Sequence, residues 1–198
     1  MAAQHLHNVV AVLGMPTLNL PEMYIQWKDG LVVDGAIGQA SREHVQKFVD
    51  AADASARKRF APEICETRAE NFQLNQKYLV DGRGGEPHEV HMGKTLFCKQ
   101  LAGMSRLYQY VLERGPLTIT LGADRRTATV EADYVEKMPY YEEGTIVASP
   151  DIYEDVQVVE SHDRSVVGIE DGKLKFLSTD ADIYVRLVPK HDMPLPYN

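Results

Sequence analysis

Two β-prone runs joined by a tight turn, RSVVGIEDGKLKFLSTDADIYV from Arg164 to Val185, decide the fold class of this 198-residue chain. RSVVGIE and KLKFLS flank a DGK turn, and DIYVRLV follows as a further run. Upstream, LTITL, TATVEADYV and VQVVES alternate in the same way, and His162-Asp163 reads as a turn after VQVVES. Sequential strands with tight turns predict an antiparallel, strongly curved sheet in the C-terminal part of the chain.

Three helical patterns come before these strands. The first begins after Ser41, a suitable N-cap, and runs to Arg57–Arg59, with apolar residues on one face. The second begins near Pro62 and continues through Phe72. The third runs from Lys94 to Arg114 and stops at Gly115-Pro116. A short strand, PHEV, precedes the third helix after a glycine-rich turn. Helices packed on a bent sheet form an α+β domain.

The N-terminal 40 residues have a different pattern. MYIQWKDGLVVDG places Asp29-Gly30 between two β-prone arms, which is typical of a β-hairpin. The proline-rich tail after residue 188 has no regular pattern and is expected to pack as an extended arm. The predicted organisation is therefore a hairpin element over 1–40, one α+β domain over 41–188, and a tail over 189–198.

The element order over roughly residues 41–188 resembles the nuclear-transport-factor-2-like family, also called SnoaL-like. Two stretches carry the resemblance: HMGKTLFCKQL, a short strand leading into the long helix, and RSVVGIEDGKLKFLSTDADIYV, the two final strands. The resemblance implies a cone in which a curved antiparallel sheet, covered by three N-terminal helices, encloses a pocket. The hairpin over 1–40 is an addition to that pattern.

Charge and cysteine content exclude several classes of protein. The chain has 29 acidic and 21 basic residues, a formal charge of −8, which disfavours nucleic acid and anionic membranes as partners. No signal peptide or membrane-spanning run is evident, so a cytoplasmic protein is expected. Cys65 and Cys98 each lie in an apolar helical pattern, which favours two buried thiols but leaves one disulfide open.

The stretch EPHEVHMGKT, Glu86 to Thr95, suggests two kinds of site that its spacing does not support. A phosphate loop needs a glycine where His88 stands. On a strand, His88 and His91 point to opposite faces, so they do not converge on a metal. No GxSxG nucleophile or dinucleotide fingerprint is present. We therefore expect neither a metal nor a cofactor, and His91 is left as a single pocket histidine.

Acid–base chemistry in an apolar pocket is the remaining possibility, because burial shifts the pKa of a titratable group. On TATVEADYV, Ala128, Val130, Ala132 and Tyr134 share one face, so Tyr134 would be a polar group in an apolar wall. His91 and Tyr134 are the predicted catalytic residues. The predicted binding residues come from the loop over Glu136–Pro150 and from the third helix: Tyr140, Tyr141, Met104 and Tyr108.

Two functions stay open at this point. The family resemblance implies a cofactor-independent lyase, isomerase or cyclase that acts on an apolar cyclic or polyketide-like molecule, with a tyrosine hydroxyl stabilising the oxyanion. The absence of a recognisable acid–base constellation instead favours a noncatalytic ligand-binding or dimerising module, expected as a homodimer. An open cavity near Tyr134 and His91 would favour the enzyme.

Overall fold

The computed structural model describes residues 26–28, 31–33, 38–58, 61–80, 87–104, 109–141 and 153–196. Its helices are α2 (Arg42–Arg57), α3 (Ala61–Glu66) and α4 (Lys94–Met104). Its strands are β1 (Gln26–Lys28), β2 (Leu31–Val33), β3 (Arg68–Val80), β4 (His88–Gly93), β5 (Val111–Arg114), β6 (Thr118–Leu121), β7 (Thr127–Pro139), β8 (Asp155–Glu170) and β9 (Lys173–Pro189). None of the described helices is long and apolar enough to cross a membrane.

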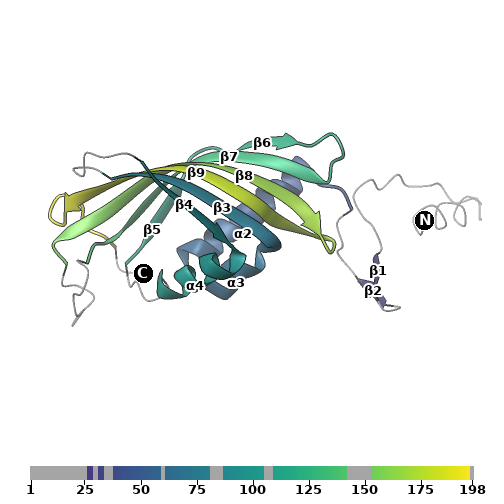
Figure 1. Cartoon of the computed structure of the whole chain (residues 1–198), viewed down its shortest axis with the longest axis horizontal. Coiled ribbons are helices and arrows are strands. Elements are labelled where there is room, and N and C mark those ends of the chain that lie inside the picture. The colour runs from purple at the N-terminus through teal and green to yellow at the C-terminus, as the bar shows by residue number, and fades with distance from the viewer. Residues whose placement is uncertain are drawn as a thin grey trace, which may run out of the picture.

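One curved, seven-stranded sheet organises the molecule, and the three described helices lie on its concave side (Figure 1). The strand order is β4-β3-β9-β8-β7-β5, and β6 also pairs with β7. The chain is therefore α+β with a strongly bent sheet. β1 and β2 form a separate two-stranded antiparallel pair, with Trp27 opposite Val32.

The expected all-antiparallel sheet is corrected to a mixed sheet. β3 pairs with β9 in parallel, with Leu74 beside Thr179 and Tyr78 beside Ile183. Tight turns force an antiparallel pairing only between strands that follow one another in the sequence. β3 and β9 are separated by nearly half of the chain, so their direction depends on the topology rather than on a turn.

The β8–β9 hairpin is longer than the sequence pattern indicates. β8 continues without a break through His162 and Asp163, which pair with Asp133 and Ala132 of β7. The expected turn at these residues is therefore wrong. The DGK turn does form, with positive φ angles of 50° at Asp171 and 72° at Gly172, residues that tolerate the left-handed region.

The first predicted helix is confirmed in α2. Ser41 caps it by accepting a hydrogen bond from the His44 backbone N–H (3.1 Å), and Val45 and Val49 are buried. The second helix is much shorter than predicted, because α3 ends at Glu66 and Phe72 lies in β3.

The third predicted helix also ends early. α4 stops at Met104, and residues 111–114 form β5 instead. The predicted loop over 136–150 is wrong at its start, since Glu136–Pro139 belong to β7; residues 142–150 lie outside the described residues.

Two clusters of buried side chains define the faces of the sheet. On the face that we call inner, residues of β3, β7, β8 and β9 pack against α2 in the main core. Its members include Val45, Val49, Phe72, Ala128, Val130, Val167 and Phe176. On the opposite, outer face, Val156 and Val158 are fully buried beneath Tyr153 and Leu195. The C-terminal segment thus covers one end of the outer face.

A disulfide joins Cys65 of α3 to Cys98 of α4, with their Cα atoms 5.7 Å apart. The expectation of two buried thiols is corrected, because α3 and α4 pack side by side and bring the sulfur atoms together. The bond closes a loop with a sequence separation of 33 residues. It therefore limits the conformational freedom of the unfolded chain.

Replacing both cysteines, Cys65→Ser with Cys98→Ser, should lower the free energy of unfolding by roughly 2–4 kcal/mol, as expected for a loop of this length. Urea denaturation measures the change, and wild-type protein kept in reductant should unfold at the same urea concentration as the double variant. Equal stability of the oxidised wild type and the double variant would contradict a stabilising role.

Candidate functional site

A cluster of polar side chains occupies the inner face of the sheet beneath α2. We call it the inner cluster and define it as Asp53, Arg68, Arg114, Tyr134 and Asp163. Strand register places its members, since residues paired across neighbouring strands point to the same face. Arg114 of β5 pairs with Tyr134 of β7, which pairs with Ser161 of β8. Asp163 is two residues further along β8 and shares this face.

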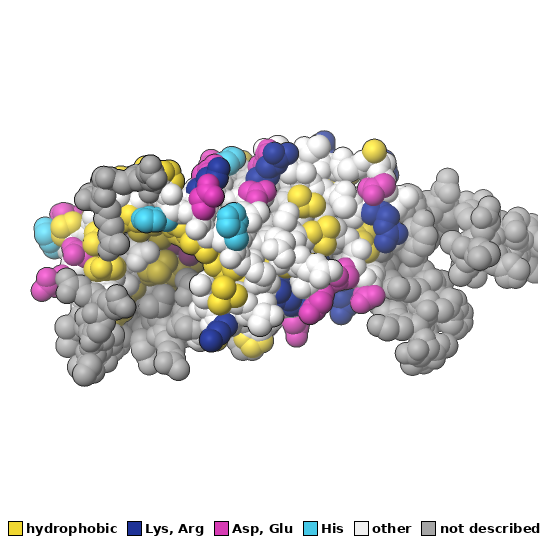
Figure 2. All heavy atoms as spheres, viewed as in Figure 1, with side chains coloured by type: hydrophobic (Ala, Val, Ile, Leu, Met, Phe, Trp, Pro, Cys, Tyr) yellow, Lys and Arg dark blue, Asp and Glu magenta, His cyan; other side chains and the backbone are white. Residues whose placement is uncertain are grey.

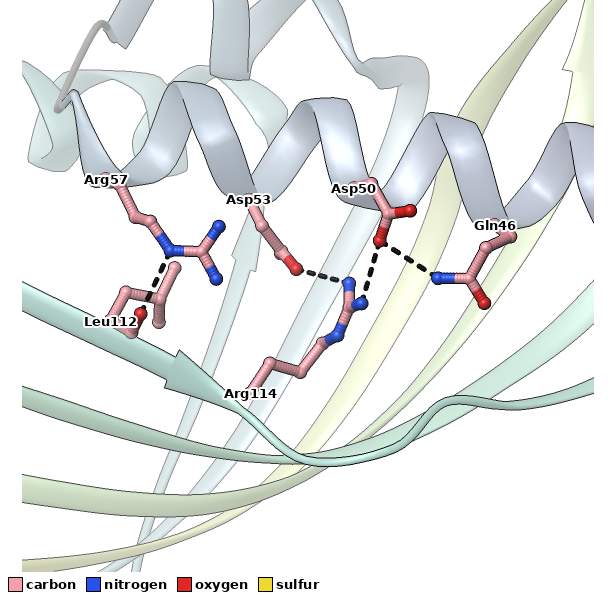
Figure 3. A network of polar contacts seen from close by, with 6 residues as sticks. All are labelled: Gln46, Asp50, Asp53, Arg57, Leu112 and Arg114. Atoms are coloured by element: carbon pink, nitrogen blue, oxygen red, sulfur yellow. Dashed lines mark hydrogen bonds and ion pairs between the residues drawn. The ribbon is translucent and has the colours of Figure 1, made fainter.

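Arg114 connects the sheet to α2 (Figure 3). Its Nη1 contacts the Asp53 carboxylate, and its Nη2 donates to Asp50 Oδ1 at 2.8 Å. The Arg114 charge also acts on the Tyr134 hydroxyl, which is paired with it across β5 and β7, and opposes the rise in its pKa. The Arg114 hydrogen bond lowers the pKa of the exposed Asp50 carboxyl. Burial nevertheless raises the pKa of Asp53, outweighing the attraction of Arg114.

Apart from Asp53, which is bound by Arg114, the members of the inner cluster that can exchange protons are Tyr134 and Asp163. Burial raises the pKa of the Asp163 carboxyl, although Ser161 Oγ donates to Asp163 Oδ1 at 2.7 Å and opposes that effect. Burial also raises the pKa of the Tyr134 hydroxyl, and the Asp53 and Asp163 charges add to the increase. At neutral pH, Tyr134 is therefore a hydrogen donor, and Asp163 is a stronger base than an exposed aspartate.

A second buried pair lies further along the same face of β7. Tyr110 OH donates to Glu136 Oε2 at 2.5 Å, and burial raises the pKa of the Glu136 carboxyl. Tyr110 is only 6% exposed. The inner face therefore carries two titratable carboxyl groups, Asp163 and Glu136, among largely apolar neighbours.

The two predicted catalytic residues lie on opposite faces of the sheet. Tyr134 faces inward, together with Ala128, Val130 and Ala132, as predicted. His91 faces outward, because the register of β4 on β3 turns its neighbour Met92 into the core. The His91 side chain is 65% exposed, and its Nδ1 lies 2.8 Å from Asn75 Oδ1. No pocket can therefore be formed by His91 and Tyr134 together.

The predicted binding residues are dispersed. Tyr141 packs edge-on against Tyr153, with ring centroids 6.4 Å apart, in the cluster of the outer face. Tyr140 is half-buried at the end of β7, and its backbone N–H donates to Asp155 O at 2.9 Å. Met104 ends α4, but its side chain lies outside the described residues, and so does Tyr108.

Sequence reasoning missed Asp53, Arg68, Arg114 and Asp163. Asp163 was assigned to a turn, although the alternation of Ser161, Asp163, Ser165 and Val167 along VVESHDRSVV contains the signal of one continuous strand face. Asp53 lies beside Ala52 in the buried stripe of α2 and is only 7% exposed. An acidic residue beside the apolar stripe of a helix is the sequence signal that could have indicated Asp53 as a site residue.

A groove of about 400 Å³ lies on the outer face, over β4, β3, β9, β8 and β7. Charged and imidazole side chains of both signs line it: Lys77, Glu89, His91, Glu131, His162, Arg164, Asp180 and Asp182. Figure 2 shows acidic, basic and histidine side chains gathered along the convex side of the sheet. Among the described residues, no group of three His, Cys, Asp or Glu side chains is arranged to hold a metal.

Comparison with known proteins places the fold. No family model matches the chain, and no curated protein matches it in sequence. A candidate scytalone dehydratase from Novosphingobium aromaticivorans aligns at 11% identity, over 71% of this chain and 82% of that one, with a TM-score of 0.52. LinA aligns at 10% identity, over 75% and 88% of the two chains, with a TM-score of 0.50.

The chain has the nuclear-transport-factor-2-like fold. A third structure, an NTF2-like protein with a cystatin-like fold from N. aromaticivorans, aligns at 17% identity over 72% and 80% of the chains, with a TM-score of 0.48. At these identities the likeness shows the fold alone. In this NTF2-like fold the inner cluster lies on the concave side of the sheet, beneath the helices.

Proposed function

We propose that this protein is a cofactor-independent lyase that removes water or halide from an apolar cyclic molecule at the inner cluster. The observation that carries the proposal is the shared inner face of Asp163 and Tyr134, which presents a base of raised pKa and a half-buried hydroxyl donor on one side of the sheet. The fold is shared with a candidate scytalone dehydratase and with LinA, a dehydrochlorinase, and both are lyase-type proteins. That likeness supports the class of reaction.

Asp163 is the proposed general base. Its carboxylate takes the proton from a carbon next to an electron-withdrawing group, which holds the C–H electron pair as a stabilised carbanion or enolate. That pair then forms the new C=C bond as the leaving group departs with its own bonding pair. Ser161 supports this role because its hydroxyl donates to one carboxylate oxygen at 2.7 Å and fixes the rotamer. Among the described residues no hydrogen bond is found at the second oxygen, which we assign to the substrate proton.

Tyr134 is the proposed hydrogen donor to the substrate. The Arg114 charge attracts the Tyr134 hydroxyl oxygen and lowers the pKa that burial raises. A guanidinium carries only hydrogen-bond donors, so it leaves the Tyr134 hydroxyl hydrogen unused. The Tyr134 hydrogen is then available for a carbonyl oxygen or a departing group, where it stabilises developing negative charge. Asp50 and Asp53 fix Arg114, so the positive charge on the strand position paired with Tyr134 is in place before the substrate arrives.

The substrate body is expected to be apolar and cyclic. The walls around Asp163 and Tyr134 include Ala132, Ala181 and Ile183, which are all buried. A compact hydrocarbon ring matches such walls, since it loses no hydrogen bonds when it leaves water.

Tyr134→Phe should lower kcat about 100-fold with little change in KM, because one stabilising hydrogen bond is lost mainly in the transition state. The assay screens wild-type protein against β-hydroxycyclohexanones and chlorinated cyclohexanes and detects the alkene product by absorbance. Turnover that survives unchanged in Tyr134→Phe would reject the donor role. A complete absence of turnover across the panel would reject the lyase proposal.

A noncatalytic module is the second candidate function, and the groove of the outer face favours it. Acidic and basic side chains alternate along the groove, so they suit a partner surface that also carries both acidic and basic groups. A second copy of this chain, forming a homodimer, is one such partner. This alternative predicts ligand binding or assembly without turnover in the same screen. The cytoplasmic location stays a prediction, and the Cys65–Cys98 disulfide argues for a more oxidising setting.

A further inference from the structure

The Arg68 guanidinium is held among three aromatic rings at the start of β3. Its central carbon lies 4.3 Å from the ring centroid of Phe176, 5.0 Å from that of Phe97 and 5.2 Å from that of Phe72. These rings come from β9, α4 and β3, so three elements position one cation. Cation–π contacts of this kind favour the charged group while leaving its N–H edges free for hydrogen bonds.

Arg68 lacks a counter-ion among the described residues. Nη1 donates to Thr67 Oγ1 at 2.7 Å, but no described carboxylate lies within ion-pair distance of the guanidinium. Within the same described part of the chain, its buried Nε has no hydrogen-bond partner. An unpaired buried donor on a cation costs free energy, so an anionic ligand at the edge formed by Nε and Nη2 would satisfy it.

Arg68 also lies within electrostatic range of the proposed catalytic groups. The charges of Tyr134, Asp163 and Asp53 favour its protonated form, whereas burial lowers its pKa to about 10. The guanidinium therefore stays charged at neutral pH. A ligand bound at its edge would lie on the same face of the sheet as the base and the hydroxyl donor of the inner cluster.

We propose that Arg68 binds the carboxylate of a cyclic carboxylic acid, which makes the substrate of the inner cluster an anion with an apolar ring. That the bound acid is a substrate rests on the proposed function, whereas the binding itself can be tested without any turnover. The planar fork of a guanidinium matches both oxygens of a carboxylate. Of the three rings around Arg68, that of Phe97 is only half-buried, and it supplies the apolar surface against which the ring of the acid packs.

Benzoate is the probe, and benzamide is its neutral counterpart of the same shape. Calorimetric titration should detect benzoate binding to the wild-type protein, with benzamide at least about tenfold weaker. Arg68→Gln should weaken benzoate binding about tenfold or more. Arg68→Lys keeps the charge but lacks the planar fork, so its affinity for benzoate should lie between that of the wild type and that of Arg68→Gln. Asp163→Asn should bind benzoate as well as wild type or better, because a nearby negative charge is gone.

Arg186→Gln is the matched control, since Arg186 lies on the outer face and pairs with Glu160 at 3.1 Å. It should bind benzoate like wild type. If Arg68→Gln does not fold, as judged by circular dichroism, the comparison of Arg68→Lys with wild type decides the question. Equal binding of benzoate and benzamide, no benzoate binding to wild type, or full binding by a folded Arg68 variant would overturn the proposal.

The outcomes separate this inference from the proposed function. Elimination from neutral β-hydroxycyclohexanones without benzoate binding would overturn the role of Arg68 and leave the lyase standing. Benzoate binding through Arg68 without turnover in the elimination screen would reject the lyase and support an acid-binding site. If both hold, benzoate should inhibit elimination competitively in the wild type and about tenfold less effectively in Arg68→Gln.

Discussion

Replacing Asp163 with asparagine should nearly abolish turnover while making the protein more stable. Loss of the general base is expected to lower kcat about 1,000-fold. Asparagine has the same shape and can still accept a hydrogen bond from Ser161, which keeps the local geometry. A variant that is both less active and more stable separates a functional carboxylate from a structural one.

The stability gain has a defined pH dependence. Burial raises the pKa of Asp163 in the folded state above its ordinary value of 3.8. The protonated carboxyl is therefore the form that folding favours, and that stability is present below pH 3.8 and lost as pH rises through the folded pKa. At neutral pH the variant avoids the cost of a buried carboxylate, so its Tm should be higher, by about 2–4 °C per kcal/mol gained. The difference should shrink toward acid pH.

Asp133→Asn is the matched control for this prediction. The same change from aspartate to asparagine is made there on β7, the strand next to that of Asp163. The Asp133 side chain is 78% exposed on the outer face, where it pairs with His162. Thermal denaturation should give a positive Tm shift at neutral pH for Asp163→Asn and no positive shift for Asp133→Asn, which loses at most the small contribution of its exposed pair with His162 at acidic pH. An inactive Asp163→Asn with a lowered Tm would mean that the carboxylate stabilises the fold.

Replacing Arg114 with methionine should destabilise the fold by about 3–5 kcal/mol. Methionine keeps much of the aliphatic stem, but it leaves the Asp53 carboxylate, only 7% exposed, without its ionic partner. The variant also loses the contact between β5 and α2 through Asp50. Urea denaturation measures the loss, which should exceed that of any exposed ion pair in the protein.

Two further variants test whether the buried charge is the cause. Lys47→Met breaks an exposed pair with Glu43 on the same helix and should cost less than about 1 kcal/mol. The double variant Asp53→Asn with Arg114→Met removes both charges and should recover most of the lost stability. Equal losses in the single Arg114 variant and the double variant would show that packing, not the unpaired carboxylate, explains the effect.

Local periodicity predicted the parts of this protein in which one face of an element is uniformly apolar. The alternation of Ala128, Val130 and Ala132 placed Tyr134 on the inner face, and the stripe of Val45 and Val49 gave α2 with its Ser41 cap. The element order was enough to indicate the nuclear-transport-factor-2-like fold, which is confirmed.

The inner cluster could not be predicted in the same way, because its members are polar residues at core positions. In the sequence, Asp163 interrupts an apolar pattern and stands beside the polar His162. Two adjacent polar residues between apolar runs predict a turn. Arg68 is adjacent to the aromatic rings only after β3, β9 and α4 have assembled. Leu112 fits both a helical stripe and a strand by its sequence pattern. In the structure it belongs to β5, because it pairs with Glu136 of β7.

Proton exchange at carbon tests the central claim most directly. In deuterium oxide, wild-type protein should replace the α-hydrogens of a β-hydroxycyclohexanone with deuterium, because Asp163 removes a proton from carbon. Proton NMR measures the loss of the α-hydrogen signal. Asp163→Asn should exchange at the rate of the protein-free solution, and Asp133→Asn at the wild-type rate. Exchange by Asp163→Asn at the wild-type rate would contradict the assignment of the inner cluster as the active site.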